Sequence, residues 1–169
     1  MSRERPHSMT RTDSGLLIAF EGIDGAGKTT QVELLTQALL AQHKSVIRSK
    51  EPTDGVWGQK IRTSSRTDRM TLPDELHAFI EDRNEHLRDK ILPALNQGQT
   101  VILDRYFYST IAYQGSRGGD VATITAQMFA SAPEPDIVSL IDAPPEVGLA
   151  RIRQGRGEVP NAFETLANL

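Results

Sequence analysis

A glycine-rich segment between an apolar run and a helical pattern constrains the fold more than any other feature of this chain. Residues 22–29 read Gly-Ile-Asp-Gly-Ala-Gly-Lys-Thr and match the pattern G-x-x-x-x-G-K-[ST]. The run 16–20 before it has the length and apolarity of a strand buried on both faces, and Val32, Leu35 and Leu39 after it recur at helical spacing. Glycines let the backbone turn tightly, and a helix N-terminus carries about half a positive charge. This order therefore predicts a loop that binds nucleotide phosphates.

Two side chains of the loop have chemistry suited to a phosphoryl group and its metal. Lys28 is expected to reach the β- and γ-phosphates of ATP, and the Thr29 hydroxyl to hold Mg²⁺. The other reading of the segment is a glycine-rich turn capped by a threonine, which the strand before it and the helix after it disfavour. The full set expected around the ATP phosphates is Gly22, Asp24, Gly25, Ala26, Gly27, Lys28, Thr29 and Thr30.

Composition narrows the class of protein. The 169 residues suffice for one domain, and a net charge of −3 without a clustered basic run argues against nucleic acid as a ligand. There is no cysteine, and the four histidines have no spacing typical of metal ligands. No apolar stretch approaches the length of about 20 residues that spans a bilayer. Residues 1–14 lack the apolar core of a secretion signal. We expect them to be a flexible extension of a cytoplasmic protein with no membrane partner.

The order of patterns along the chain predicts the architecture. Three more short apolar runs, 45–49, 100–104 and 136–142, alternate with helical patterns. This alternation is typical of a three-layer α/β fold, in which a parallel sheet has helices on both faces and binds ligands at the carboxyl ends of its strands. Residues 73–97 predict one long helix that Pro93 loosens near its end. Residues 15–169 are thus expected to be one domain.

A polar tripeptide follows the third predicted strand. Asp104 is placed to orient Mg²⁺ or its waters, and Arg105 can clamp a phosphate with its planar guanidinium. A surface ion pair at a strand end is the alternative reading. A position behind a phosphate-binding loop favours the first reading.

Four motifs together resemble those of one enzyme family. They are Glu21 to Thr30, then Lys50-Glu51-Pro52, then Phe79 with Arg83, then Asp104-Arg105-Tyr106 continuing to Ser109 and Ala112-Tyr113-Gln114. In this order and spacing they are similar to those of the thymidylate kinases, from about residue 16 onward. The resemblance implies a P-loop fold with a five-stranded parallel sheet, Mg²⁺ as cofactor, and a homodimer. It also implies the activity, transfer of the γ-phosphoryl of ATP to dTMP with formation of ADP and dTDP.

The resemblance also implies roles for the acceptor side of the site. Phe79 would stack on the thymine, and Arg83, one helical turn later, would hydrogen-bond its edge; without the family, a phenylalanine on a helix is usually core. Arg105 would bind the 5′-phosphate and Asp24 the 3′-hydroxyl. Tyr106 would lie against the deoxyribose. The whole expected acceptor set is Asp24, Lys50, Glu51, Pro52, Phe79, Arg83, Arg105, Tyr106, Ser109, Tyr113 and Gln114.

Arginines late in the chain complete the expected machinery. Phosphoryl transfer needs in-line positioning and neutralisation of charge, which arginine supplies. Residues 151–160 resemble the mobile lid of the family, and Gly25 stands where some members carry a loop arginine. We therefore expect Arg153 or Arg156 to contact the transferring group, with Arg151 less favoured; a solvated basic loop is the alternative. The catalytic set is Lys28, Asp104, Arg105, Arg153 and Arg156, and the metal set is Thr29, Asp104 and Glu51.

The match has departures. Lys50 stands where many members have arginine, which loses the bidentate grip on a phosphate. Thr53-Asp54-Gly55 replaces the commoner Gly-Gly-Thr. Family members continue through a last strand and helix, whereas this sequence ends at Leu169, so we expect a shortened C-terminus and weaker stability or ATP affinity.

Other functions remain open at this point. The nearest is a kinase for another nucleoside monophosphate or for a nucleoside. A second is a nucleotide-binding remnant without turnover. A nucleotide-dependent switch lacks support, because the chain has no Asn-Lys-x-Asp base-reading motif.

Overall fold

The computed structural model describes residues 15–156. The expected extension 1–14 and the lid residues 157–160 lie outside these described residues. The boundary between extension and domain therefore stays a prediction.

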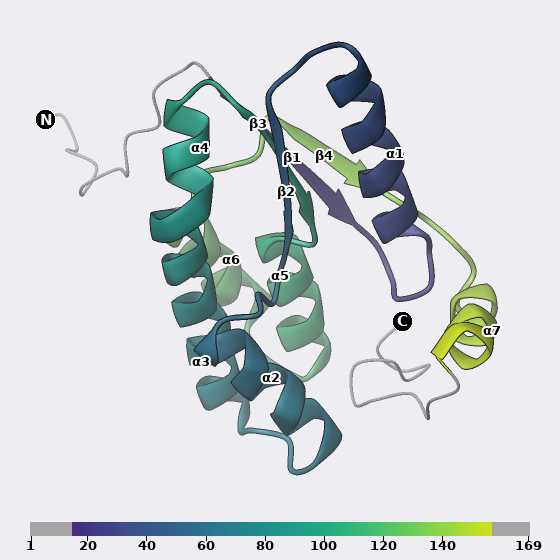
Figure 1. Cartoon of the computed structure of the whole chain (residues 1–169). Helices are drawn as coiled ribbons and strands as arrows, with labels where there is room; N and C mark the ends of the chain where they lie inside the picture. Colours follow the sequence, from purple (N-terminus) through teal and green to yellow (C-terminus); the bar gives the residue numbers. More distant parts are fainter. Residues whose placement is uncertain (1–14, 157–169) are drawn as a thin grey trace, which may run out of the picture.

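The described residues contain one parallel sheet of four strands (Figure 1). The spatial order is β2-β3-β1-β4. Leu17 lies opposite Val101 in the β1–β3 ladder, and Ile18 lies opposite Ile137 in the β1–β4 ladder. All four strands follow the apolar runs of the sequence; β3 coincides with its run, and no end of the other three is shifted by more than two residues. Their bounds are β1 Leu16–Glu21, β2 Val46–Lys50, β3 Thr100–Asp104 and β4 Ile137–Leu140.

Helices connect the strands and lie on both sides of the sheet (Figure 1). Helix α1 lies on one side, and the α3–α4 helix, α5 and α6 lie on the other. The bounds are α1 Lys28–Ala41, α2 Val56–Arg66, α3 Leu72–His86, η1 Leu87–Ile91, α4 Leu92–Asn96, α5 Phe107–Ser116, α6 Val121–Ser131 and α7 Pro145–Arg156. The predicted three-layer α/β fold is confirmed, whereas α2 was not anticipated from the sequence.

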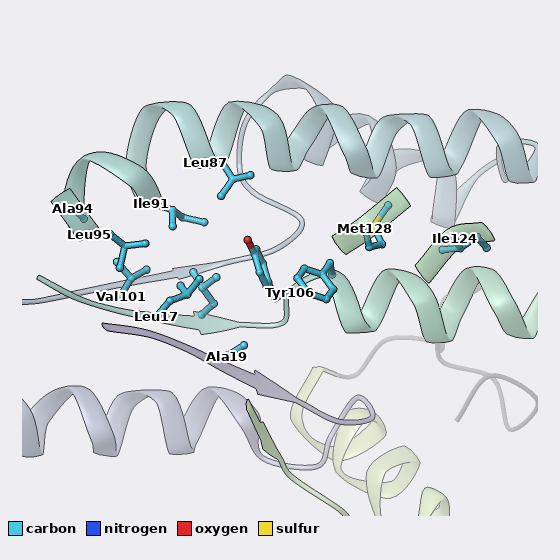
Figure 2. Close-up of a cluster of buried hydrophobic side chains, with 12 residues drawn as sticks. Leu17, Ala19, Leu87, Ile91, Ala94, Leu95, Val101, Tyr106, Ile124 and Met128 are labelled. Atoms are coloured by element: carbon cyan, nitrogen blue, oxygen red, sulfur yellow. The ribbon is translucent and has the colours of Figure 1, made fainter. Parts of the chain in front are cut away.

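The core is divided by the sheet because successive side chains of a strand point to opposite faces. On one face, Leu17 and Ala19 pack with Leu87 and Ile91 of the long helix (Figure 2). On the other face, Ile18 and Phe20 pack with residues of α1. The apolar run 16–20 of β1 is therefore covered on both sides, as its sequence indicates.

The long helix predicted for 73–97 is present and contains one looser turn. Thr71 caps its start, because the Thr71 side chain accepts a hydrogen bond from the Asp74 N–H. Residues 87–91 form a π-helical turn, in which the Leu92 N–H donates to the Leu87 carbonyl. Pro93 has no N–H to donate to a carbonyl in the turn before it, and this weakens regular α-helical bonding there. The irregular helical turn thus lies before Pro93, at residues 87–91, and not in the turn after it.

Candidate functional site

The phosphate-binding loop joins β1 to α1 in a backbone path that only glycine can follow. Gly22, Gly25 and Gly27 have φ of 141°, 77° and 109°, in the left-handed region that other residues rarely adopt. A Cβ at Gly25 would lie 2.3 Å from the Gly148 carbonyl oxygen of α7. The structure therefore disfavours a side chain at residue 25 for two reasons, the left-handed φ and the close approach of α7 to the loop.

The loop gathers charge at the N-terminus of α1. Lys28 is buried, with its Nζ donating to the Ile23 carbonyl at 2.7 Å and lying 3.8 Å from Asp24. Burial, together with the charge of Arg105, lowers the pKa of Lys28 to about 8 against the attraction of Asp24. No side chain caps α1, whose first turn has no acidic residue. This helix end is thus electrostatically suited to an anion.

A hydroxyl and a carboxylate meet between α1 and β3. The Thr29 hydroxyl donates to Asp104 Oδ2 at 2.5 Å. Among residues 15–156 there is no cluster of three or more His, Cys, Asp or Glu side chains that could hold a metal. Mg²⁺ in phosphate sites uses only one or two protein oxygens and completes its shell with phosphates and water. The Thr29–Asp104 pair fits that requirement.

Arg105 contacts three polar side chains of the site. Its guanidinium donates to Asp24 Oδ1 at 2.8 Å, to Ser109 Oγ at 2.8 Å and to the Tyr113 hydroxyl at 3.1 Å. Burial acts to lower the pKa of Arg105, but pairing with Asp24 raises it above its ordinary value. Its φ is 70°, an uncommon value for a residue other than glycine. Such outliers cost about 1–3 kcal/mol and concentrate at functional sites.

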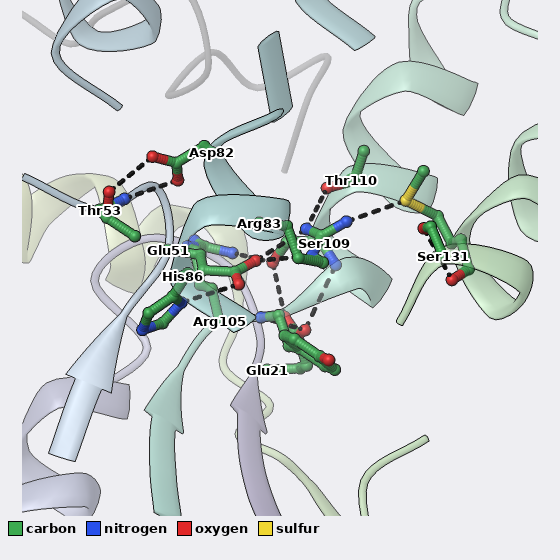
Figure 3. A network of polar contacts seen from close by, with 12 residues as sticks. Glu21, Glu51, Thr53, Asp82, Arg83, His86, Arg105, Ser109, Thr110 and Ser131 are labelled. Atoms are coloured by element: carbon green, nitrogen blue, oxygen red, sulfur yellow. Dashed lines mark hydrogen bonds and ion pairs between the residues drawn. The ribbon is translucent and has the colours of Figure 1, made fainter. Parts of the chain in front are cut away.

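Another arginine, Arg83, is buried and lies on α3. Arg83 Nε and Nη2 contact Glu51 Oε2 at 2.9 and 2.8 Å, and His86 Nδ1 lies 3.0 Å from Glu51 Oε1 (Figure 3). Burial raises the pKa of Glu51, but the Arg83 charge and the His86 hydrogen bond outweigh it and lower the pKa. Both carboxylate oxygens are thereby engaged. Of the three residues expected to bind the metal, Thr29 and Asp104 thus contact each other, whereas Glu51 contacts Arg83 and His86.

One cleft of about 1080 Å³ connects the phosphate-binding loop to Phe79 and Arg83. It lies at the carboxyl ends of the strands, where a parallel sheet is expected to bind ligands. The predicted site residues that line it are Asp24, Gly25, Ala26, Gly27, Lys28, Thr29, Thr30, Lys50, Glu51, Pro52, Phe79, Arg83, Asp104, Arg105, Tyr106, Ser109 and Tyr113. Gly22 and Gln114 do not line it.

Two predicted acceptor residues are buried deeper than expected. Tyr106 is 1% exposed, and its hydroxyl donates to the Pro133 carbonyl at 3.2 Å. Gln114 is fully buried, and neither amide atom has a hydrogen-bond partner among the described residues. A buried unpaired amide costs about 1–3 kcal/mol. The Gln114 amide thus has an unused donor, Nε2, and an unused acceptor, Oε1, among the described residues.

The lid arginines are placed differently from one another. Arg151 Nη1 donates to the Gly25 and Ala26 carbonyls at 3.0 and 3.3 Å, and Arg151 lines the cleft. Arg153 is exposed and does not line it. Arg156 belongs to α7, but its side chain lies outside the described residues. Of the two lid arginines whose side chains are described, Arg151, which sequence reasoning favoured less, thus contacts the loop.

The structure adds residues that sequence reasoning missed. Thr110 Oγ1 accepts from Arg83 Nη2 at 3.0 Å and lines the cleft. Arg62 of the unanticipated α2 also lines the cleft and donates to the Pro52 carbonyl at 3.0 Å. Lys50, which the sequence did single out, pairs with Asp54, and 3.2 Å separates Lys50 Nζ from Asp54 Oδ1. Thr110 lies one residue after Ser109 in a motif already singled out, whereas no sequence signal marked Arg62.

The β2–α2 loop is fixed to α3 by a buried acid. Asp82 accepts from the Thr53 N–H at 2.8 Å and from the Thr53 hydroxyl at 2.6 Å. Figure 3 shows this pair beside the Glu51–Arg83 contact. The departure Thr53-Asp54-Gly55 therefore has a defined anchor on α3.

Comparisons with known proteins place the motifs in context. Residues 20–168 match a family model described as "Thymidylate kinase". A thymidylate kinase of Xanthomonas oryzae pv. oryzae is 52% identical over 155 residues, which cover 92% of this chain and 67% of that protein. A thymidylate kinase of Xylella fastidiosa is 47% identical over 156 residues, covering 92% and 70%. The chain thus spans about two thirds of the length of these relatives.

A solved structure resembles the fold. The crystal structure of thymidylate kinase from Ehrlichia chaffeensis aligns with a TM-score of 0.72 at 35% sequence identity. The alignment covers 84% of each chain. None of the helices within residues 15–156 is both long and apolar enough to cross a bilayer.

Proposed function

The chain belongs to the thymidylate kinase family, and from that membership we propose that its cleft transfers the γ-phosphoryl group of ATP to dTMP, with release of ADP and dTDP. One observation carries the proposal. A single cleft runs from the phosphate-binding loop past Arg105 to Phe79 and Arg83, so that a donor triphosphate and a nucleoside monophosphate can lie end to end. Phosphoryl transfer requires this in-line arrangement.

At the donor end, the phosphates of ATP lie over the loop and the N-terminus of α1. Lys28 and the backbone N–H groups of residues 25–30 neutralise their charge. Thr29 and Asp104 would hold Mg²⁺, which would supply further charge stabilisation when bound. Glu51 is left out of this metal site, because Arg83 and His86 occupy its carboxylate.

At the acceptor end, Arg105 binds the 5′-phosphate with its planar guanidinium. Asp24 shares the Arg105 guanidinium and is placed to accept from the 3′-hydroxyl, while Phe79 stacks on the base. Arg83, which lines the cleft, addresses the edge of the base. The amide of Gln114 is of a kind that suits a thymine edge, which offers both N–H and carbonyl groups, but Gln114 is fully buried and does not line the cleft.

A lid arginine neutralises the transferring phosphoryl group. Gly25 leaves no side chain in the loop for this task, and Arg151 already reaches the loop carbonyls from α7. We therefore propose Arg151 beside Arg153 and Arg156 as candidates. An arginine in this role contributes about 10³- to 10⁵-fold in related chemistry.

The assembly and location follow the family. We propose a homodimer that acts in the cytoplasm on small-molecule substrates, with neither nucleic acid nor membrane as partner. The net charge of −3 supports the absence of a nucleic-acid ligand. Light scattering of the purified chain tests the dimer.

The function is tested by coupled ADP release with ATP, Mg²⁺ and each of dTMP, dUMP, dCMP and thymidine. The proposal predicts the highest kcat/KM with dTMP and loss of turnover in Lys28→Ala. Equal rates with dTMP and dCMP would favour a kinase of another specificity. Binding of dTMP without turnover would leave only a nucleotide-binding protein.

Among the lid arginines, Arg151→Ala and Arg153→Ala form a matched pair. We expect the larger loss of kcat from Arg151→Ala, because only Arg151 of the two contacts the loop. The opposite order would assign the role to Arg153.

A further inference from the structure

One buried acid at the site is assigned no role by the motifs. Glu21 is the last residue of β1 and is 5% exposed. Its Oε1 accepts from the Tyr106 N–H at 2.8 Å and from the Ser109 N–H at 3.3 Å. Its Oε2 accepts from the Ser109 hydroxyl at 2.5 Å. Figure 3 shows Glu21 directed to Ser109 and Arg105, and Glu21 does not line the cleft.

The carboxylate covers the start of α5. That helix begins at Phe107, and Tyr106 at its N-cap position gives no side-chain cap. Glu21, reaching across from β1, therefore accepts from the Ser109 N–H, at the N3 position that a local cap would bind, and from the N–H of the N-cap residue Tyr106 itself. A negative charge is also favourable at a helix N-terminus.

The same contacts fix the backbone at Arg105. The Arg105 N–H donates to the Phe20 carbonyl at 2.9 Å, and the next N–H, of Tyr106, donates to Glu21. Arg105 is thus held on both sides at φ 70°, a conformation that needs such surroundings to persist.

The Ser109 hydroxyl passes this constraint on to the guanidinium. A hydroxyl has one hydrogen and two acceptor lone pairs. The hydrogen goes to Glu21, so a lone pair is left to accept from Arg105 Nη1 at 2.8 Å. Removing the Glu21 acceptor frees the hydroxyl to rotate and weakens the contact with Arg105.

We propose that Glu21 is a positioning residue that sets the affinity of the site for the acceptor phosphate through Ser109 and the Arg105 backbone, without touching the acceptor. The proposal rests on the proposed function in one respect, that Arg105 binds this phosphate. A simpler role, as a cap that stabilises α5 alone, makes a different prediction.

The experiment compares the Kd values of dTMP and thymidine, whose ratio reports the contribution of the phosphate. Glu21→Gln keeps the size of the side chain and replaces one acceptor oxygen by a donor NH₂. We expect the ratio Kd(thymidine)/Kd(dTMP) to fall by about 10-fold or more, the effect of losing a hydrogen bond to a charged group. Thymidine affinity should change less than about twofold.

Ser109→Ala is the second variant. It should lower the ratio in the same way, and the effects of Glu21→Gln and Ser109→Ala should be less than additive in the double variant, since both variants remove the link through the Ser109 hydroxyl. Equal weakening of dTMP and thymidine by Glu21→Gln would reduce Glu21 to a helix cap and overturn the proposal. Unchanged Kd values for both ligands, which also leave the ratio unchanged, would overturn it as well.

A ligand-independent measurement separates the two proposals. The Arg105 side chain is 13% exposed, and phenylglyoxal modification of arginines can be located by mass spectrometry. Faster modification of Arg105 in Glu21→Gln, with no change at Arg83, supports the positioning role even if the wild type shows no preference for dTMP. In that event the proposed function fails alone, whereas unchanged modification of Arg105 overturns the positioning role.

Discussion

Two arginines, the half-buried Arg105 and the buried Arg83, stand at the two ends of the acceptor half of the cleft and are held in different ways. Arg83 lies on a regular helix and pairs directly with a carboxylate that is itself buried. Arg105 lies in a strained connection between β3 and α5 and pairs with the less buried Asp24. A helix positions its side chain by its own geometry, whereas a connection needs anchors from elsewhere, which here include Glu21.

The difference should be visible in substrate discrimination, where we expect the largest effects. Arg105→Ala should lower kcat/KM for dTMP by about 10³-fold, because it removes the guanidinium that pairs with the acceptor phosphate. Truncating one partner of such a charge pair costs about 2–5 kcal/mol when the pair is buried in the complex. The preference of this variant for dTMP over dCMP should stay unchanged. Arg83→Ala should lower that preference instead. Steady-state kinetics with both acceptors measure this, and the same pattern in both variants would break the division between phosphate end and base end.

The second effect concerns stability. Arg83→Ala leaves Glu51 as a buried charge and should lower the free energy of unfolding by about 3–5 kcal/mol. For a chain of this size the midpoint temperature then falls by about 10 °C. The double variant Arg83→Ala/Glu51→Gln is the control and should recover part of the loss. Urea unfolding measures both, and a loss under 1 kcal/mol for Arg83→Ala would show that the pair is not buried as described.

A smaller effect isolates the backbone. At φ 70° glycine is favoured over alanine, so Arg105→Gly should be more stable than Arg105→Ala by about 1 kcal/mol. In the helix interior the order reverses, and the free energy of unfolding of Arg83→Ala should be higher than that of Arg83→Gly by about 1 kcal/mol. The Gly and Ala variants at each position both lack the guanidinium, so the difference between their free energies of unfolding in denaturant reports the backbone preference. The same order at both positions would contradict the strain at Arg105.

The smallest expected effect is in pH dependence. Burial raises the pKa of Glu21, so its contribution to stability is full below its unfolded pKa and is lost as the pH rises through the folded pKa. The pKa of Glu51 is lowered, so its contribution is present above its unfolded pKa and is lost as the pH falls through the folded pKa. Stability relative to Glu51→Gln should thus increase from pH 4 to pH 7, and stability relative to Glu21→Gln should decrease. Urea titrations at both pH values check the signs, and parallel trends would be inconsistent with these shifts.

The sequence by itself determined the elements that local chemistry dictates. Residues 22–29 require glycine backbone geometry, the apolar run 16–20 requires a covered strand, and the helix 73–97 follows its spacing. Order along a parallel sheet then gathers the residues after each strand at one edge, which brings Asp104 and Arg105 beside the loop. These predictions needed no knowledge of long-range contacts.

Only the tertiary structure decided what each polar side chain contacts. The Glu51 carboxylate was expected to organise Mg²⁺, yet it lies against Arg83 and His86, because α3 packs beside the end of β2. Arg151 rather than Arg153 reaches the loop, because the close approach of Gly148 to Gly25 fixes how α7 is placed. Glu21 acquires its partners from α5, far along the chain. Such pairings depend on distances between elements and on shared burial, which no pattern of neighbouring residues records.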